Sequence, residues 1–134
     1  MRKLLLLLFL SSTVLADNLL ATPETLTIQG KACTLNANAW RDMMPSMPKR
    51  PPPVTISVAL AGVSAKRIVW ERLWVFESGK QVWEGKLVDN GNGAANASPG
   101  PGVGGKLEVV AQFKTADGHT YRLRKSGLAV GRVD

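Results

Sequence analysis

Cysteine and histidine are nearly absent from this sequence, since each occurs only once among 134 residues. Because Cys33 has no second cysteine to pair with, no intrachain disulfide can hold the chain together, and its stability must come from an ordinary core. His119 lies beside a turn, no serine lies in a nucleophile motif, and most acidic residues fall opposite lysines or in turns. This scarcity of catalytic groups predicts a protein that is not an enzyme.

Long apolar runs are also scarce, and the one that occurs lies at the N-terminus. Leu4 to Leu10 follows the basic pair Arg2-Lys3 and precedes small residues that end at Ala16. The run is too short to span a bilayer and is typical of a secretory signal peptide. We therefore predict a signal peptide over residues 1–16, cleaved near Ala16, and one exported, soluble domain over residues 17–134. This domain should have no transmembrane segment and should be periplasmic or secreted from a bacterial cell.

Acidic residues are in the minority. Once Arg2 and Lys3 are removed with the signal peptide, 15 of the 17 basic residues remain against 10 acidic ones, a net charge of +5. Export and the lack of a recognised motif argue against nucleic acid as a partner. An anionic glycan or a protein of the cell envelope fits the charge better, and simple solubility explains it equally well.

Helical periodicity is missing, and the strongest pattern in the chain is a hairpin around Ser78-Gly79. Apolar residues alternate on both sides of this pair, which is typical of a two-residue turn between antiparallel strands. The turn sets Glu77 opposite Lys80 and Trp74 opposite Trp83.

One face of this hairpin should be dry. It carries Ile68, Trp70, Trp74, Phe76, Trp83 and Leu87. We interpret the face as core, but Arg72 lies between Trp70 and Trp74, and an unpaired buried guanidinium is expensive. The alternative is therefore an open aromatic patch, with a stacked arginine, suited to a protein or glycan partner.

A second hairpin is predicted near the start of the mature chain, after a loose leader over residues 17–24. With Gly30-Lys31 as the turn, Ile28 faces Cys33 and Leu26 faces Leu35. This register places Cys33 in the core as a small buried residue. A bridge to another chain or a metal thiolate are the alternatives.

A third hairpin is predicted toward the C-terminus. A loop over residues 116–118, with Gly118 left-handed, sets Phe113 against Tyr121 and Ala111 against Leu123. This register separates the apolar residues from the charged ones, whereas a two-residue turn would set apolar residues against arginines. A short final strand follows.

Proline and glycine gather in two stretches. Residues 40–53, WRDMMPSMPKRPPP, include five prolines, and proline lacks the amide that a central strand needs. We predict an extended crossover here. Residues 89–105 are almost entirely glycine, asparagine, alanine and proline, which predicts a mobile loop.

Seven or eight short strands joined by one proline-rich crossover predict an all-β protein, an antiparallel β-sandwich. The layout resembles immunoglobulin-like and fibronectin-like domains at the level of fold, and such a fold does not by itself indicate a function.

The sequence favours a non-catalytic binding module whose main surface is the crossover, because a pre-extended backbone loses little entropy when a partner docks. Basic residues on the outer face of the last hairpin add to that surface. The candidate partner-binding residues are Trp40, Arg41, Met43, Met44, Met47, Arg72, Arg122 and Arg124.

The same methionines support an alternative function. Met43, Met44 and Met47 lie within five residues, and thioether sulfurs are soft ligands that suit Cu(I). His119 or Cys33 would complete a copper site if the fold brought either of them close. The protein would then be a Met-rich Cu(I)-binding periplasmic protein, whereas methionines in a crossover can also simply fill gaps.

Overall fold

The computed structural model describes residues 18–42, 54–62, 68–90, 93–99 and 105–133. The predicted signal peptide, the methionines of the crossover and residues 43–53 lie outside the described residues. A single helical turn, residues 18–20, precedes the strands. The strands are β1 (Thr25–Ile28), β2 (Lys31–Asp42), β3 (Val54–Ala61), β4 (Val69–Glu77), β5 (Lys80–Lys86), β6 (Val88–Asp89), β7 (Ala94–Ala97), β8 (Lys106–Lys114) and β9 (Thr120–Val133). No helix among these residues is long and apolar enough to cross a membrane.

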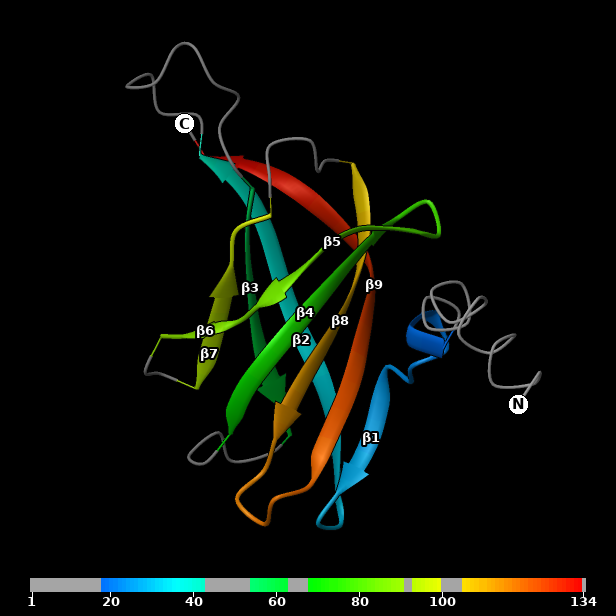
Figure 1. Ribbon diagram of the computed structural model, residues 1–134, viewed down its shortest axis with the longest axis vertical. Coiled ribbons are helices and arrows are strands. Elements are labelled where there is room, and N and C mark those ends of the chain that lie inside the picture. The colour runs from blue at the N-terminus through cyan, green and yellow to red at the C-terminus, as the bar shows by residue number, and fades with distance from the viewer. Residues whose placement is uncertain (1–17, 43–53, 63–67, 91–92, 100–104, 134) are drawn as a thin grey trace, which may run out of the picture.

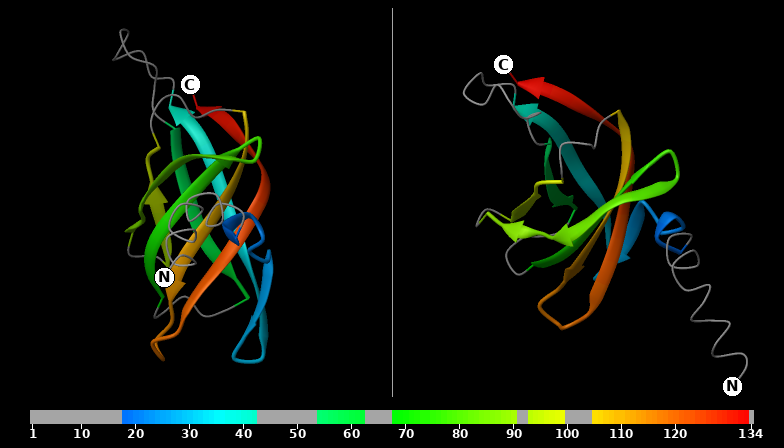
Figure 2. Two further views of the ribbon diagram at one scale, coloured as in Figure 1. Left: turned by 45° about the vertical axis from the view of Figure 1, so that its right-hand side comes forward. Right: turned by 45° about the horizontal axis from the view of Figure 1, so that its top comes forward.

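The strands form one sheet that curves round until it nearly closes (Figures 1 and 2). Their order is β5-β4-β8-β9-β2-β3-β7-β6, with β1 paired to β2. β5 and β6 lie at the two ends of this order, yet only Leu87 separates them in the chain. One stretch of backbone therefore pairs with β4 and then with β7. The Leu87 N–H also donates to the Glu71 carbonyl at 3.0 Å, which fastens this crossing to β4.

The prediction of an all-β protein is confirmed, but the sheet is mixed and barrel-like rather than purely antiparallel. β2 runs parallel to the end of β9, with Ala39 opposite Val130. β9 is much longer than the sequence pattern suggested, and it pairs first with β8 and then with β2. A register shift in the β8–β9 pairing lies beside Gly127, whose φ of 66° favours glycine. The irregularity at Gly127 lies between the part of β9 that pairs with β8 and the part that pairs with β2, so one strand joins both groups of strands.

β1 and the end of β9 occupy the same edge of β2. Thr34 of β2 pairs with Thr25 of β1 on one side and with β3 on the other. The turn of this first hairpin is Gln29-Gly30, with φ of 52° and 78°, so Leu26 and not Ile28 lies opposite Cys33. The register differs from the predicted one by two residues, which leaves every side chain on the predicted face. Cys33 is fully buried, as predicted.

The tryptophan hairpin confirms its predicted turn and the predicted pair beside it, but not the predicted pair of tryptophans. Ser78 and Gly79 both have positive φ, and Glu77 lies opposite Lys80. A bulge between Val75 and Phe76 then shifts the register, so Trp74 lies opposite Glu84 and not opposite Trp83. The sequence could not reveal this bulge, because a register without a bulge already set Glu77 opposite Lys80 and Trp74 opposite Trp83.

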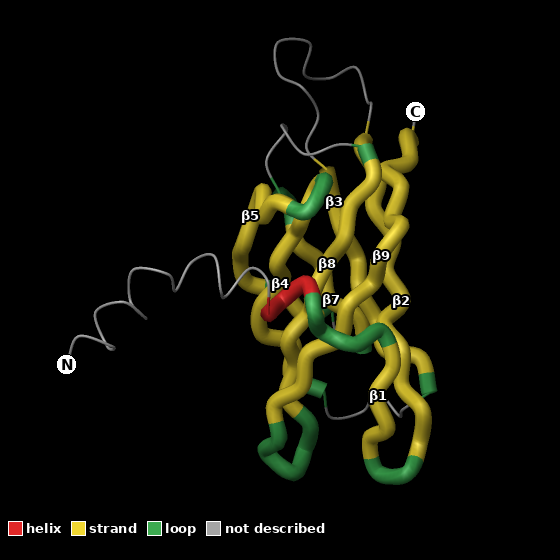
Figure 3. The backbone as a smooth tube through the Cα atoms, turned by 90° about the vertical axis from the view of Figure 1, so that its right-hand side faces the viewer, coloured by secondary structure: helices red, strands yellow, loops and turns green. Residues whose placement is uncertain are grey.

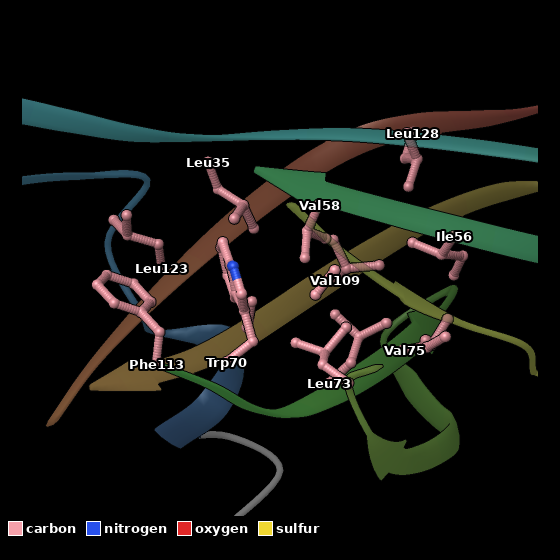
Figure 4. Close-up of a cluster of buried hydrophobic side chains, with 14 of the residues drawn as sticks. Leu35, Ile56, Val58, Trp70, Leu73, Val75, Val109, Phe113, Leu123 and Leu128 are labelled. Atoms are coloured by element: carbon pink, nitrogen blue, oxygen red, sulfur yellow. The ribbon is translucent and has the colours of Figure 1, made fainter. Parts of the chain in front are cut away.

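A second bulge in β4, between Trp70 and Arg72 where it pairs with β8, divides the predicted dry face. Trp70 points into the barrel, as do Leu73 and Val75 (Figure 4). Trp74 and Phe76 are buried on the outside of the sheet instead, in a separate cluster. The residues predicted to share one dry face are therefore divided between the inside and the outside of the barrel.

The remaining predictions for the strands have mixed outcomes. In the last hairpin Phe113 lies opposite Tyr121, Ala111 lies opposite Leu123, and Gly118 has a φ of 87°, all as predicted. Within residues 89–105, for which a mobile loop was predicted, the structure has β7 paired to β3. Its alanines are small enough for the strand to pack closely on the core.

The barrel has a continuous apolar core to which most of its strands contribute buried side chains (Figure 4), whereas β5 contributes only the partly buried Trp83. Its largest fully buried side chains include Ile28, Ile56, Leu73, Leu87, Leu107, Phe113 and Leu123. Trp70 packs against Phe113 with ring centroids 5.5 Å apart, and its Nε1–H donates to the Gly93 carbonyl.

Candidate functional site

A second apolar cluster lies on the outside of the barrel, over β4 and β8. Trp74, Phe76 and Val110 form its floor, and Leu19 from the N-terminal segment covers them. Trp74 and Val110 are paired residues on neighbouring strands. Leu19 is fully buried and Trp74 is only 4% exposed, although both lie outside the barrel. We call the outer surface of β4, β8 and β9 around this cluster the outer face.

Residues 18–24 cross the outer face, and we call this segment the strap. Figure 3 shows it running from the helical turn beside β4 to the start of β1. Its helical turn is closed by the Thr22 N–H, which donates to the Leu19 carbonyl at 3.1 Å. Leu19 and Thr22 are the buried residues of the strap, and Leu20 is partly buried. The segment expected to be a loose leader is therefore docked on the sheet.

Arg124 of β9 makes most of the polar contacts that hold the strap. Its backbone N–H donates to the Pro23 carbonyl at 3.0 Å, and its Nε donates to the Thr22 carbonyl at 2.9 Å. Its Nη1 lies 3.1 Å from Oε2 of Glu108 on β8, and its Nη2 lies 3.7 Å from Oε2 of Glu24. The guanidinium thus bridges the strap and the sheet, and the side chain is only 23% exposed.

Glu24 provides a second anchor at the end of the strap. Its Oε1 accepts hydrogen bonds from the Ser126 hydroxyl at 2.9 Å and from the Ser126 N–H at 3.1 Å. These two bonds, with a smaller contribution from the charge of Arg124, hold the pKa of Glu24 below its ordinary value. The carboxylate is therefore charged at neutral pH and binds β9.

An arginine stacks on the central tryptophan of the outer face, but it is not the one that the sequence suggested. The Arg122 guanidinium lies 5.0 Å from the centre of the Trp74 ring. Its Nε donates to Oε1 of Gln112 at 2.8 Å, and Nε2 of Gln112 donates to Oε1 of Glu71 at 3.0 Å. Glu71, Gln112 and Arg122 thus form a chain across three neighbouring strands.

The other side of Trp74 is held by Glu84 of β5. Nε1 of Trp74 donates to Oε2 of Glu84 at 2.9 Å, and Nη2 of Arg72 lies 3.3 Å from the same oxygen. Arg72 is therefore an exposed rim residue paired with Glu84, not an arginine between two indoles. The outer face as a whole has an aromatic and aliphatic centre and a charged rim.

The structure brings together three of the predicted partner-binding residues, because Arg72, Arg122 and Arg124 all belong to the outer face. Trp40 and Arg41 are not in a crossover loop but in β2, where they pair with β3 and with the last residues of β9. Their partners on β9 follow Arg124 by at least seven residues, or roughly 23 Å of strand. Sequence reasoning missed the strap, for which the apolar pair Leu19-Leu20 was the available signal.

His119 lies in the exposed loop between β8 and β9. Its Nε2 is 3.8 Å from Oδ2 of Asp117, and Asp117 also accepts a hydrogen bond from the Thr115 hydroxyl, which lowers the pKa of its carboxyl. Asp42, the last described residue before the methionines, pairs with Val133 at the other end of β9. The contour of β9 between these ends is roughly 40 Å. The structure therefore does not bring His119 toward that end of β2.

Cys33 is enclosed in the barrel core, and burial raises the pKa of its thiol. Among the described residues, no three histidine, cysteine, aspartate or glutamate side chains are grouped as metal ligands would be. No known protein-family model matches the chain, and no curated protein matches it either. Its function must accordingly be argued from the outer face itself.

Proposed function

We propose that this protein is an exported, non-catalytic binding module of the bacterial cell envelope, and that it docks a protein or glycan partner through the outer face. The observation that carries this proposal is the second apolar cluster. Trp74, Phe76 and Val110 are buried outside the barrel core, under a strap that contributes few side chains.

The chemistry of the outer face supports binding. Protein interfaces combine an apolar centre with a polar rim, and tryptophan and arginine are the residues that most often dominate their binding energy. Trp74 lies at the centre here, and Arg72, Arg122 and Arg124 lie around it. The hydrogen bonds of Trp74 and Arg122 fix these side chains in place before a partner arrives. Such preorganisation lowers the entropy cost of docking.

We further propose that the barrel is a closed variant of the immunoglobulin-like sandwich. Support comes from the strand order, in which β5, β4, β8 and β9 are neighbours and β2, β3, β7 and β6 are neighbours. In immunoglobulin-like domains the corresponding groups form two facing sheets. The parallel pairing of β2 with β9 and the crossing from β5 to β6 would join those sheets into one.

Export is supported by the sequence of residues 1–16 alone. Cleavage near Ala16 would leave the strap at the N-terminus of the mature protein. The outer face would then be covered by the first residues of the exported chain.

The alternative proposal, Cu(I) binding, rests on Met43, Met44 and Met47, which lie in one short stretch of sequence. Replacing all three with leucine separates the two proposals. Loss of stoichiometric Cu(I) binding in this triple variant would favour copper handling, whereas a protein interface should tolerate the change.

Site-specific photo-crosslinking in the exporting cell tests the main proposal. A photoreactive residue at Arg72, on the rim of the outer face, should give a discrete adduct. The matched control is Asn36, an exposed residue of β2, which should give none. The adduct from position 72 should weaken when Arg122→Ala removes the stacked guanidinium. Equal adducts from both positions, or none from position 72, would contradict a binding role for the outer face.

A further inference from the structure

The strap and the barrel have separate apolar clusters. Leu19 packs with Trp74, Phe76 and Val110, and none of these four residues belongs to the barrel core. The barrel core is enclosed by its own sheet, which nearly closes without the strap. Removing the strap would therefore expose the outer cluster and leave the barrel core covered.

The strap is held at few points. Among the backbone hydrogen bonds of the described residues, the one from the Arg124 N–H to the Pro23 carbonyl joins the strap to the sheet. The remaining polar contacts go to Arg124 and Ser126 on β9. β1, which follows the strap, is paired to β2 by its own register. The strap can therefore leave the outer face while β1 stays in place.

We propose that the strap is a placeholder, and that the outer face binds an acidic, leucine-bearing peptide segment of a partner protein in its place. This inference rests on the proposed function and adds the chemistry of the partner and the way in which access is controlled. The strap itself defines what fits. Leucine side chains would take the positions of Leu19 and Leu20, and a carboxylate would take the position of Glu24.

The charges of the outer face favour an acidic segment. Glu84 is already paired with Arg72, and Glu108 is paired with Arg124. When the strap leaves, Arg124 loses the carboxylate of Glu24 and the carbonyl of Thr22. Arg122 contacts the neutral groups of Gln112 and Trp74. The carboxylates of Glu71, Glu84 and Glu108 balance the three arginines of the face. The uncovered face would therefore attract a carboxylate locally, at the position beside Arg124 that Glu24 leaves.

A peptide with the sequence of residues 17–24, carrying a fluorescent label, tests this proposal. It is titrated into the mature full-length protein and into the Leu19→Asp variant, and binding is followed by fluorescence anisotropy. In the unmodified protein the strap occupies the face, so the apparent affinity is reduced by the small fraction of open molecules. Leu19→Asp places a charge in the apolar cluster and releases the strap, so we expect binding to tighten about tenfold or more.

The matched control is Ala21→Asp, which adds the same charge at an exposed position of the strap. It should bind the peptide as weakly as the unmodified protein. A peptide with Glu24→Gln should bind the Leu19→Asp protein less tightly, because it cannot pair with Arg124. If Leu19→Asp fails to fold, Leu19→Ala takes its place with the same expectations.

A folded variant that does not bind the peptide overturns the proposal, and so does equal binding by all three proteins. Tighter binding of the Glu24→Gln peptide than of the unmodified peptide overturns the proposal that the bound segment is acidic. These failures differ from failure of the proposed function. If the peptide does not bind but the crosslink from position 72 forms, the outer face has a partner of other chemistry. If neither occurs, the outer face is not an interface.

Discussion

At the scale of single residues, Arg124 makes an unusual number of contacts for an arginine on the outside of a sheet. It binds two carbonyls and two carboxylates, and these come from the strap and from β8. The sequence placed Arg124 correctly on the outer face of the last hairpin. The sequence could not show that the strap, about 100 residues earlier in the chain, would cover Arg124. No local pattern of residues encodes so distant a contact.

Replacing Arg124 with glutamine should therefore destabilise the protein. The change removes the charged hydrogen bonds to Thr22 and Glu108 and leaves the partly buried Glu108 without its partner. We expect the free energy of unfolding to fall by about 1–3 kcal/mol, as measured by urea denaturation. Arg122→Gln is the control, since Arg122 is exposed and should contribute less than about 1 kcal/mol. Equal losses for both variants would contradict the anchoring role of Arg124.

Glu24 should make the docking of the strap depend on pH. Its pKa is lower in the folded protein than in the unfolded chain, so its contribution is present above the ordinary value of 4.5 and is lost as the pH falls through the lowered value. The amide of Arg124, which donates to Pro23, should therefore exchange faster with solvent below about pH 4.5, relative to its intrinsic rate. Asp117 titrates in the same direction, but it lies in the β8–β9 loop.

The Glu24→Gln variant separates the two carboxylates. In this variant the exchange of the Arg124 amide, relative to its intrinsic rate, should no longer speed up at low pH. The contribution of Asp117 to overall stability should remain. Persistence of the change in the variant would mean that Glu24 does not control the strap.

At the scale of the strands, turns were predicted more successfully than bulges. Ser78-Gly79 and Gly118 need positive φ, and glycine beside a polar residue makes that need visible in the sequence. The two bulges leave no such signal, because their extra residues, Glu71 of β4 and Val82 of β5, are an ordinary charged and an ordinary apolar residue. The extra residue Glu71 shifts the alternation of β4 by one, and that shift placed Trp74 outside the barrel rather than inside it.

Gly85 of β5 shows how closely this strand is packed. A Cβ at this position would lie 2.4 Å from Cη2 and Cζ2 of the Trp83 ring, so the indole would have to move. Gly85→Ala should lower the free energy of unfolding by about 1–3 kcal/mol. Gly131→Ala is the control, because its Cβ would meet only the Ala39 carbonyl at 3.7 Å. It should leave stability within about 1 kcal/mol of the unmodified protein. A Gly85→Ala variant as stable as the control would show that Trp83 is free to move.

At the scale of the whole molecule, the near closure of the sheet could not be predicted from its strands. It depends on β5 and β6 being one stretch of chain that bends at Leu87, and on β9 reaching both β8 and β2. These are pairings between segments far apart in the sequence, and alternation within a strand does not specify its neighbours. The consequence for function is that the barrel is complete under the strap.

Hydrogen exchange at the Arg124 amide tests whether the strap opens independently of the barrel. That amide is bonded to the strap, whereas the amides of Leu73 and Val109 belong to core strands of the barrel. We predict that the Arg124 amide exchanges through a local opening, with much weaker protection than the amides of Leu73 and Val109. Leu19→Asp should speed the exchange of Arg124 and leave the barrel amides unchanged. Equal protection at all three sites, or acceleration of the barrel amides by Leu19→Asp, would show that the strap is part of the fold and not its cover.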